Sequence, residues 1–394
     1  MNSGKYIFTQ IADLIKMTPF RKLVKKYRGD YRAHDLTCYN QFLHLLFGQL
    51  SSCTSLRDIC LCLKAHESSL FHMGFGNTVD HTTLSRANEK RDYRIYEELG
   101  CFLIKTIRPL YANEKLDDVD TDLALLALDS TTISVSLKLC AWALGKYERG
   151  DIKMHTLLDL RGSIPVQIHI SDGRWHDSNM LDELMIESFA MYAADKAYVD
   201  LEALRRIHLA NAFFVVRPKS NMKFVFKEEI ADTEKGSNIV GDYIVELARE
   251  SAKNLYPDEL RFVRAIDSET GEIIDFITNN FELSALEIAN IYRHRWDIEV
   301  FFRWIKQNIV IKKLWGYSPN AVKTHRWVAI CAYLLLAWAK KLYQSDYSIT
   351  EIATLICVSL FEKANLNELL TLPNNKFGYL NSNQNVKELT LFSN

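Results

Sequence analysis

The sequence predicts an α/β fold, with a helical N-terminal region, a middle region of strands and helices, and further helices at the C-terminal end. In residues 5–110, apolar side chains recur at three- and four-residue intervals, which is typical of amphipathic helices. From about residue 120, short apolar and β-branched runs alternate with helical segments, which indicates a sheet covered by helices. From Ser284 onward, the helical pattern returns.

The N-terminal region is expected to contain four helices, at residues 7–17, 34–50, 55–66 and 82–100. The last of them is predicted to end at Gly100, because glycine often terminates a helix. A basic run, residues 21–32, separates the first two. Small helical domains with exposed basic segments are common in DNA-binding proteins, although many such domains bind nothing.

The middle region is expected to form strands at residues 123–137, 153–160, 163–173, 190–195 and 212–218, with helices at 178–189 and 198–210. Residues 219–283 contain four short strand patterns and no helical pattern, which predicts a β-rich insertion. One long helix should then run from Ser284 to residue 309, with Glu287 completing a capping box. Further helices are expected at about 317–345 and 348–370, before a polar, frayed tail of about 20 residues.

The composition is that of a soluble globular protein. The 394 residues are 48% hydrophobic and 25% charged, which excludes a disordered tail protein and a collagen-like repeat. The longest apolar run, Val328–Ala339, is too short to span a bilayer, and the N-terminus lacks a signal peptide pattern. None of the eight cysteines forms a C-x-x-C pair. We therefore expect a cytoplasmic protein with reduced thiols and no thiolate zinc site.

Charge is distributed unevenly along the chain. Residues 1–110 contain 16 Lys/Arg and 10 Asp/Glu, and residues 279–345 contain 10 and 4, so each segment has a net charge of +6. The remaining residues must be acidic, because the whole chain has a net charge of −1. Two basic segments around an acidic centre are compatible with a polyanion bound near carboxylates, although charge runs are usually solvated faces.

Two carboxylates follow predicted buried strands. Asp129 follows the apolar first half of the predicted strand at 123–137, and Asp195 is the last residue of the predicted strand at 190–195. Ligands in α/β sheets bind at the carboxyl ends of strands, and hard divalent cations such as Mg²⁺ prefer oxygen ligands. For either residue alone, a turn or a cap is the simpler interpretation.

The predicted helix at 284–309 carries the strongest local pattern. Tyr292, Arg295, Glu299 and Lys306 have offsets of 0, 3, 7 and 14, which at 100° per residue fall within about 60° of arc. An acid, two bases and a phenol on one stripe fit a metal ligand beside phosphate contacts. An exposed Arg295–Glu299 ion pair explains the same spacing equally well.

Other candidates have simpler explanations. Asp159 and Asp172 are rival metal carboxylates for which pairing or turn roles suffice. His155 and Lys153 share a strand and could point to the site, but a strand histidine is more often hydrogen-bonded within the fold. His176 and Asp177, after a glycine turn, could support the site residues or cap a helix, and the position of Asp177 favours the cap. Because no G-x-x-x-x-G-K loop is present, no nucleotide cofactor is expected.

The spacing Y-(2)-R-(3)-E-(6)-K of residues 292–306 resembles the signature of a group of bacterial insertion-sequence transposases with an Asp-Asp-Glu triad. L-A-L-D-S-T-T at 126–132 resembles the first-Asp motif of this group, and A-D-K-A-Y-V-D at 194–200 the second. Residues 47–58, 153–165 and 318–325 are also similar to it. The resemblance covers nearly the whole chain in the right order.

The resemblance implies a ribonuclease-H-like catalytic core with a β-rich insertion. Asp129, Asp195 and Glu299 would hold two Mg²⁺ ions, or Mn²⁺ as a substitute, for cleavage and strand transfer at the inverted-repeat ends of the element by a cut-and-paste route. Tyr292, Arg295 and Lys306 would contact phosphates. The expected partners are double-stranded DNA (terminal inverted repeats and target) and a second copy in a synaptic homodimer, with the protein associated with the nucleoid when bound.

The implied domains are a helical DNA-binding domain (1–115), the first part of the catalytic domain (116–218), the insertion (219–283), the catalytic Glu helix with a packing helix (284–345) and a C-terminal region (346–394). Some relatives stack a flipped base on a Trp of the insertion, but this chain has no Trp between Trp175 and Trp296. If base flipping occurs in this protein, another aromatic residue must serve, such as Phe262 or Phe276. The alternatives are a DNA-binding regulator without catalysis and an RNase-H-like nuclease.

Overall fold

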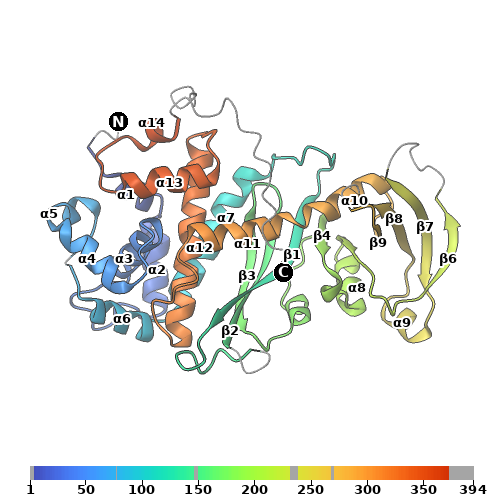
Figure 1. Ribbon diagram of the computed structural model, residues 1–394, viewed down its shortest axis with the longest axis horizontal. Helices are drawn as coiled ribbons and strands as arrows, with labels where there is room; N and C mark the ends of the chain where they lie inside the picture. The colour runs from blue at the N-terminus through green and yellow to red at the C-terminus, as the bar shows by residue number, and fades with distance from the viewer. Residues whose placement is uncertain (1–3, 77, 146–149, 231–237, 268–269, 372–394) are drawn as a thin grey trace, which may run out of the picture.

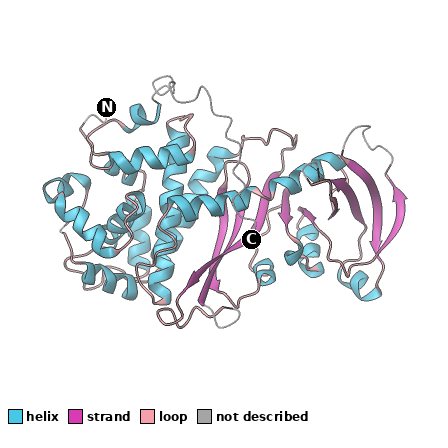
Figure 2. Ribbon diagram, viewed as in Figure 1, coloured by secondary structure: helices cyan, strands magenta, loops and turns pink. Residues whose placement is uncertain are grey.

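The computed structural model describes residues 4–76, 78–145, 150–230, 238–267 and 270–371. The chain forms a mixed α/β structure in which most helices gather at one end and the strands occupy the middle and the other end (Figures 1 and 2). The predicted frayed tail lies outside the described residues. In the described part of the chain, every helix is too short or too polar to cross a membrane. All eight cysteines are unpaired, as predicted.

The N-terminal helices are α1 (Ile7–Ala12), α2 (Met17–Lys26), α3 (Cys38–Leu50), α4 (Leu56–Ala65), α5 (Glu67–Leu70), α6 (His81–Lys90) and α7 (Arg94–Ile107). The basic run therefore forms a helix of its own, α2. The single helix predicted at 82–100 is wrong, since α6 and α7 are separate and α7 continues past Gly100. A Cβ at Gly100 would lie 2.8 Å from the Trp327 ring, so this glycine provides close packing and does not end the helix.

Nine strands form one sheet in the order β3-β2-β1-β4-β5-β9-β8-β7-β6. The strands are β1 (Ala124–Val135), β2 (Gly150–Asp159), β3 (Ile164–Asp172), β4 (Ala190–Ala194), β5 (Phe213–Val216), β6 (Phe224–Glu229), β7 (Ile239–Leu247), β8 (Leu260–Ile266) and β9 (Ile273–Thr278). Strands β1, β4 and β5 are parallel, and all other neighbouring pairs are antiparallel. The predicted insertion thus extends the same sheet, because β9 pairs with β5.

The sheet separates two apolar cores. Odd-numbered residues of β1, such as Leu125 and Ala127, join the core under α7, α10 (Ala285–His294), α11 (Asp297–Asn308) and α12 (Pro319–Leu342). Even-numbered residues, such as Leu126 and Leu128, join the core under α8 (Leu201–Leu209). This alternation follows from the two-residue period of a strand and determines which side chains face α10 and α11.

Two predicted elements of the middle region are wrong. Residues 178–189 do not form a helix beyond the short 3₁₀ turn η4 (Asp177–Leu181). The segment instead runs beside β3, where the Gln167 side chain donates to the Glu183 carbonyl and accepts from the Met185 amide. The insertion does contain a helix, α9 (Glu250–Leu255), between β7 and β8.

The long helix predicted from Ser284 is interrupted. The capping box of Ser284 and Glu287 is present, but the α-helical hydrogen-bond pattern breaks between α10 and α11. Arg295 and Trp296 keep right-handed helical dihedrals, yet their amides bond three residues back, to Tyr292 and Arg293. His294 stabilises this break, since its ring nitrogens lie 2.9 Å from Asp297 Oδ2 and 2.6 Å from Asp118 Oδ1. Helices α12, α13 (Ile349–Ser359) and α14 (Leu366–Thr371) follow and pack against the N-terminal helices.

Candidate active site

Asp129 and Asp195 lie at the same edge of the sheet and on the same face. In the parallel pair of β1 and β4, Leu128 is the partner of Ala194, and each aspartate is the next residue. Asp129 has the parity of Leu125 and Ala127, and Asp195, in extended geometry, continues the parity of Met191 and Ala193. Both side chains are therefore directed toward the face that α10 and α11 cover.

Glu299 reaches this place from the first turn of α11, and Arg295 connects it to Asp129. The Arg295 guanidinium lies 3.6 Å from Asp129 Oδ2 and 3.3 Å from Glu299 Oε1. Its side chain is only 12% exposed, against 22% for Asp129 and 33% for Glu299. The predicted Arg295–Glu299 contact forms despite the helix break, but it is part of a half-buried cluster and not an isolated surface pair.

The electrostatics of the cluster are those of crowded carboxylates. Burial raises the pKa of Asp129 to about 6, and the nearby charges of Glu299 and Asp195 act in the same direction. The Ser130 amide, 2.7 Å from Asp129 Oδ1, and the Arg295 guanidinium oppose this shift. Burial lowers the pKa of Arg295, but Tyr292 and the three carboxylates outweigh it, so the pKa is raised. All three carboxylates thus interact with one guanidinium.

Tyr292 and Lys306 occupy different surroundings. Tyr292 is buried against Phe276, with ring centroids 4.8 Å apart, and the Arg295 guanidinium lies 5.7 Å from its ring. Burial raises the pKa of the Tyr292 phenol, and Arg217, after β5, opposes the shift. Lys306 is half-buried on α11, and its pKa is lowered by burial and by Lys312 and Arg326. The structure therefore brings Tyr292 and Arg295 together, while Lys306 lies with other cations.

A polar network on the opposite face of the sheet supports the strand end at Asp129. Ser130 Oγ donates to Asp177 Oδ1 at 2.7 Å, and Lys153 Nζ lies 3.1 Å from the same oxygen. His155 Nδ1 lies 3.5 Å from it, and burial lowers the pKa of His155 to about 4. Asp177 is consequently not the predicted helix cap, because its carboxylate binds strand residues and η4 has no side-chain cap. The sequence analysis had ranked this supporting role of Asp177 below the cap, and it missed Arg217, for which no signal was present in the sequence.

The rival carboxylates have the structural roles that their sequence context suggested. Asp159 is buried and binds both Arg108 (2.7 Å) and Arg161 (2.9 Å). Asp172 accepts from the amides of Arg174 and Trp175 and so stabilises a turn. Neither carboxylate is directed to the cluster at Asp129.

The aromatic residues suggested as replacements for the insertion Trp are buried. Phe262 is 4% exposed and contacts Phe224 and Phe226, and Phe276 is 3% exposed beneath Tyr292. Neither ring presents a free face to solvent, so neither example is placed to stack on a DNA base in this structure. Among the residues near the cluster, Trp296 is 53% exposed, at the break between α10 and α11.

The carboxylates of Asp129, Asp195 and Glu299 are chemically suited to bind a divalent cation, although their oxygens are not arranged around a single ion position. Carboxylate oxygens are the ligands that hard divalent ions prefer. In the described residues, no three His, Cys, Asp or Glu side chains approach one another closely enough to hold a metal ion. The guanidinium of Arg295, which contacts Asp129 and Glu299, supplies the positive charge instead.

Comparisons with known proteins identify the family of this chain. A family model described as a transposase DDE domain matches residues 120–335, and a domain of unknown function (DUF4372) matches residues 3–76. A Sinorhizobium fredii protein named as a transposase, y4zB, is 35% identical over 245 residues, which are 61% of this chain and 68% of the relative.

Two further relatives are named as transposases of insertion sequences. The IS5377 protein of Geobacillus stearothermophilus is 30% identical over 54% of this chain and 56% of its own length. The IS4SA protein of a Synechocystis strain is 27% identical over 80% of this chain and 87% of its own length.

These matches define an enzyme that acts on DNA. The chain belongs to the DDE transposase family, whose domain model covers more than half of it. Membership implies dependence on a divalent metal ion and DNA as the partner. The family resemblance predicted from the sequence motifs is confirmed at this level.

Proposed function

We propose that this transposase cleaves DNA at the inverted-repeat ends of its own insertion sequence and joins the ends to target DNA by a cut-and-paste route. Asp129, Asp195 and Glu299 are the proposed catalytic residues. The observation that carries the proposal is that Arg295 lies between Asp129 and Glu299, while Asp195 ends the strand that pairs in parallel with the strand of Asp129. Strands β3-β2-β1-β4-β5 and α11 would form the ribonuclease-H-like core.

The same three carboxylates would hold two Mg²⁺ ions. Bound there, the ions supply activation of water or a 3′-hydroxyl and stabilisation of the leaving 3′-oxygen. The protein's own contribution is to position these groups: the Ser130 amide orients Asp129, and the helical dihedrals of Arg295 and Trp296 place Arg295 four residues before Glu299 on the same face. Arg295, Tyr292 and Lys306 would contact phosphates of the transposon end, with Arg295 best placed because it lies within the cluster.

The proposal also includes the domain arrangement. Residues 1–115 would bind the ends of the element, and two copies would pair two ends in a homodimer. Support comes from the excess of basic over acidic residues in this N-terminal segment. It also comes from the packing of α7 and α3 on α12, which joins the N-terminal helices to the helix that follows α11.

The test uses purified full-length protein and a plasmid that carries the DNA flanking this gene. Strand cleavage is compared in Mg²⁺ and in EDTA for the wild type, Glu299→Gln and Asp172→Asn. Cleavage at both boundaries is expected only in Mg²⁺, absent in Glu299→Gln and retained in Asp172→Asn, a matched carboxylate that serves a turn. End binding should survive in all three proteins.

Other outcomes identify the alternatives. Tight specific binding without cleavage would indicate a regulator. Cleavage without joining of the 3′-hydroxyl to a new strand would indicate a nuclease. Equal loss of cleavage in Asp172→Asn would contradict the assignment of the triad.

A further inference from the structure

Helix α2 and the turn after it carry exposed cations that lack acidic partners. Residues 17–32 contain six Lys or Arg and one Asp, and all seven side chains lie on exposed residues. Within the described residues, Lys26 is the only one of these cations in an ion pair. The other five form what we call the α2 basic surface: Arg21, Lys22, Lys25, Arg28 and Arg32. A run of like charges without compensation repels itself, and the repulsion is relieved by a polyanion.

The α2 basic surface borders a groove of about 890 Å³ between α2 and the start of α3. Arg21, Lys25 and Arg28 line the groove together with the apolar side chains of Phe20 and Val24. Arg21 and Lys25 are four residues apart on α2 and so lie on one face of the helix, and Arg28 reaches the same groove from the turn after α2. A row of cations spaced about 6 Å apart along a helix presents positive charge to an extended anion, not to a single small one.

The turn that follows α2 has an unusual backbone. Arg28 and Arg32 both adopt positive φ, 50° and 56°, a region that favours glycine. The glycine of this turn, Gly29, is needed elsewhere, because a Cβ there would lie 2.5 Å from Cys38 Sγ and from Ile95. The turn places Tyr31, 70% exposed, beside Arg32, whose guanidinium lies 5.2 Å from the tyrosine ring. Backbone strain at exposed arginines is more typical of a binding segment than of a merely solvated one.

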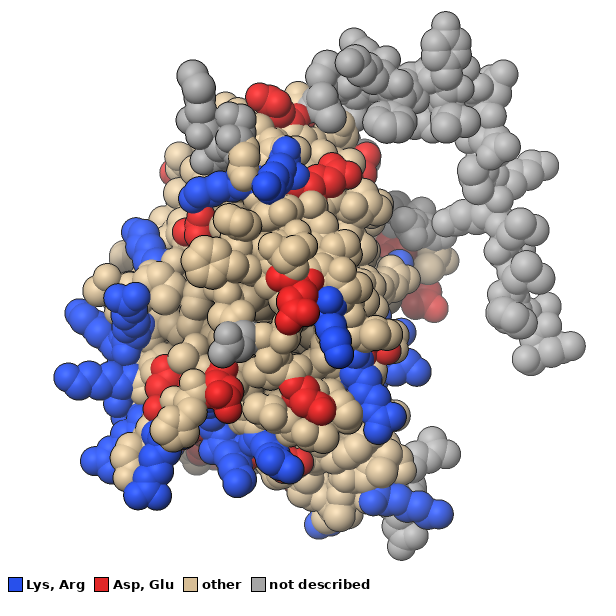
Figure 3. Space-filling view, turned by 90° about the vertical axis from the view of Figure 1, so that its left-hand side faces the viewer, with Lys and Arg blue, Asp and Glu red and all other residues tan. Residues whose placement is uncertain are grey.

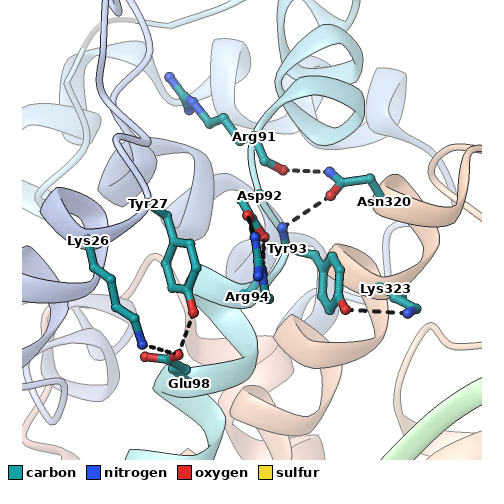
Figure 4. Close-up of polar contacts among 9 residues, drawn as sticks. All are labelled: Lys26, Tyr27, Arg91, Asp92, Tyr93, Arg94, Glu98, Asn320 and Lys323. Atoms are coloured by element: carbon teal, nitrogen blue, oxygen red, sulfur yellow. Dashed lines mark hydrogen bonds and ion pairs between the residues drawn. The ribbon is translucent and has the colours of Figure 1, made fainter.

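The end of α2, beside this surface, is attached to α7 by polar contacts (Figure 4). Glu98 of α7 accepts from Lys26 Nζ at 2.6 Å and from Tyr27 Oη at 2.5 Å, and the Arg94 guanidinium lies 4.9 Å from the Tyr27 ring. Residues 318–325 are one of the segments that resemble the transposase group. In this segment, the Asn320 side chain accepts a hydrogen bond from the Tyr93 amide and donates one to the Arg91 carbonyl. The end of α2, α7 and the start of α12 are thereby linked by polar contacts.

We propose that the α2 basic surface binds the phosphate backbone of double-stranded DNA and does so without reading the base sequence. Lysine and arginine side chains on a helix beside a groove can neutralise successive phosphates, and such contacts carry no sequence information. Figure 3 views the end of the molecule that the N-terminal helices form. On this face, Lys and Arg side chains concentrate along one edge and the lower rim, with Asp and Glu scattered among them. This inference rests on the proposed function, because it names the contact surface for the DNA, and it gives a role to part of the domain of unknown function that matches residues 3–76.

The experiment measures DNA binding by full-length protein in EDTA, so that cleavage does not contribute. Fluorescence anisotropy with two duplexes, one from the element's end and one of random sequence, gives the association constant over a range of salt concentrations. The test variant is Arg21→Ala/Lys25→Ala. The matched control is Lys64→Ala/Lys90→Ala, which removes the same charge from exposed positions on α4 and α6.

Loss of two phosphate contacts should reduce the slope of log K against log salt by about 2, because each phosphate contributes roughly 0.9. Both duplexes should lose the same factor in affinity, and the control should keep the wild-type slope. The proposal would be overturned by an unchanged slope in the test variant or by an equal change of slope in the control variant. A loss of affinity confined to the end duplex would also overturn it, because such a loss indicates base reading. A Tm equal to that of the wild type verifies folding, and Arg28→Gln/Arg32→Gln provides a second variant. Absent cleavage in Mg²⁺ with an intact slope effect would refute the proposed active site but not this surface.

Discussion

Replacing a buried aspartate by asparagine should have opposite effects at two places in this protein. At Asp129 the ionised carboxylate is unfavourable in the folded state, because burial raises its pKa to about 6 from the ordinary 3.8. A shift of about 2 units corresponds to about 3 kcal/mol. Asn cannot ionise and keeps an oxygen that can accept from the Ser130 amide. Asp129→Asn should therefore stabilise the metal-free protein by up to about 3 kcal/mol at pH 8.

The pH dependence follows from the direction of the shift. A carboxyl group whose folded-state pKa is raised contributes its stability fully below pH 3.8 and loses it as the pH rises through about 6. The advantage of Asp129→Asn should fall to about half at pH 5 and vanish below pH 4. A stabilisation that is independent of pH would point to altered packing and not to the removed charge.

Asp159 provides the contrast, because its carboxylate has two arginine partners in a buried setting. It binds Arg108 Nε at 2.7 Å and the Arg161 guanidinium at 2.9 Å. Asp159→Asn removes the charged partner of Arg161 and one of the two carboxylates that bind Arg108, which keeps Glu187, and should cost about 3 kcal/mol at pH 8. Urea unfolding in EDTA, followed by circular dichroism, measures both variants. Destabilisation at Asp129 as large as at Asp159 would refute the reasoning.

Three further changes test other parts of the structure. Asp177→Asn removes the carboxylate that binds Ser130 and Lys153, and it should lower the cleavage rate about 10–100-fold while DNA binding in EDTA stays constant. An unchanged cleavage rate would show that the network does not position Asp129. Asn320→Ala removes the side chain that bridges the loop between α6 and α7, and it should lower the free energy of unfolding in urea by about 1–3 kcal/mol. An unchanged free energy of unfolding would show that water replaces the side chain. The pKa of His294 is raised by its hydrogen bond to Asp297, so its contribution to stability is full below pH 6.5 and is lost as the pH rises through the raised value. In His294→Gln, the free energy of unfolding measured between pH 6 and 8 should no longer show this pH dependence.

Local patterns were enough to predict most strands and the main helices. The apolar runs that became β1 and β4 each stop at a carboxylate, and the parallel pairing of these strands brings Asp129 and Asp195 side by side. The capping box at Ser284 also follows from local chemistry, since Ser and Glu three residues apart satisfy each other's backbone amides. These features depend on neighbouring residues, and the sequence contains that information.

The features that were mispredicted depend on distant residues. The break after His294 is stabilised by Asp118, 176 residues earlier, and no periodicity within 284–309 indicates it. Asp177 lies where a cap is common, yet its carboxylate is taken by Ser130, 47 residues away. Gly100 has the appearance of a helix end, but the constraint there is the Trp327 ring. In each case a long-range contact overrides a local preference.

Arg295 connects the charge balance of the cluster to its proposed work on DNA. Without a metal ion, one guanidinium faces three carboxylates, so the cluster is negative overall, and the raised pKa of Asp129 is the expected consequence. A divalent cation bound by the same oxygens relieves that excess, and the guanidinium is then no longer needed as their counter-charge. Its Nε is buried and, among the described residues, has no hydrogen-bond partner, and its planar fork matches a phosphate in a way that an ammonium group does not. We therefore propose that Arg295 neutralises the carboxylates in the free protein and binds a DNA phosphate once a cation is bound, a double role that requires a position inside the cluster and not at its rim.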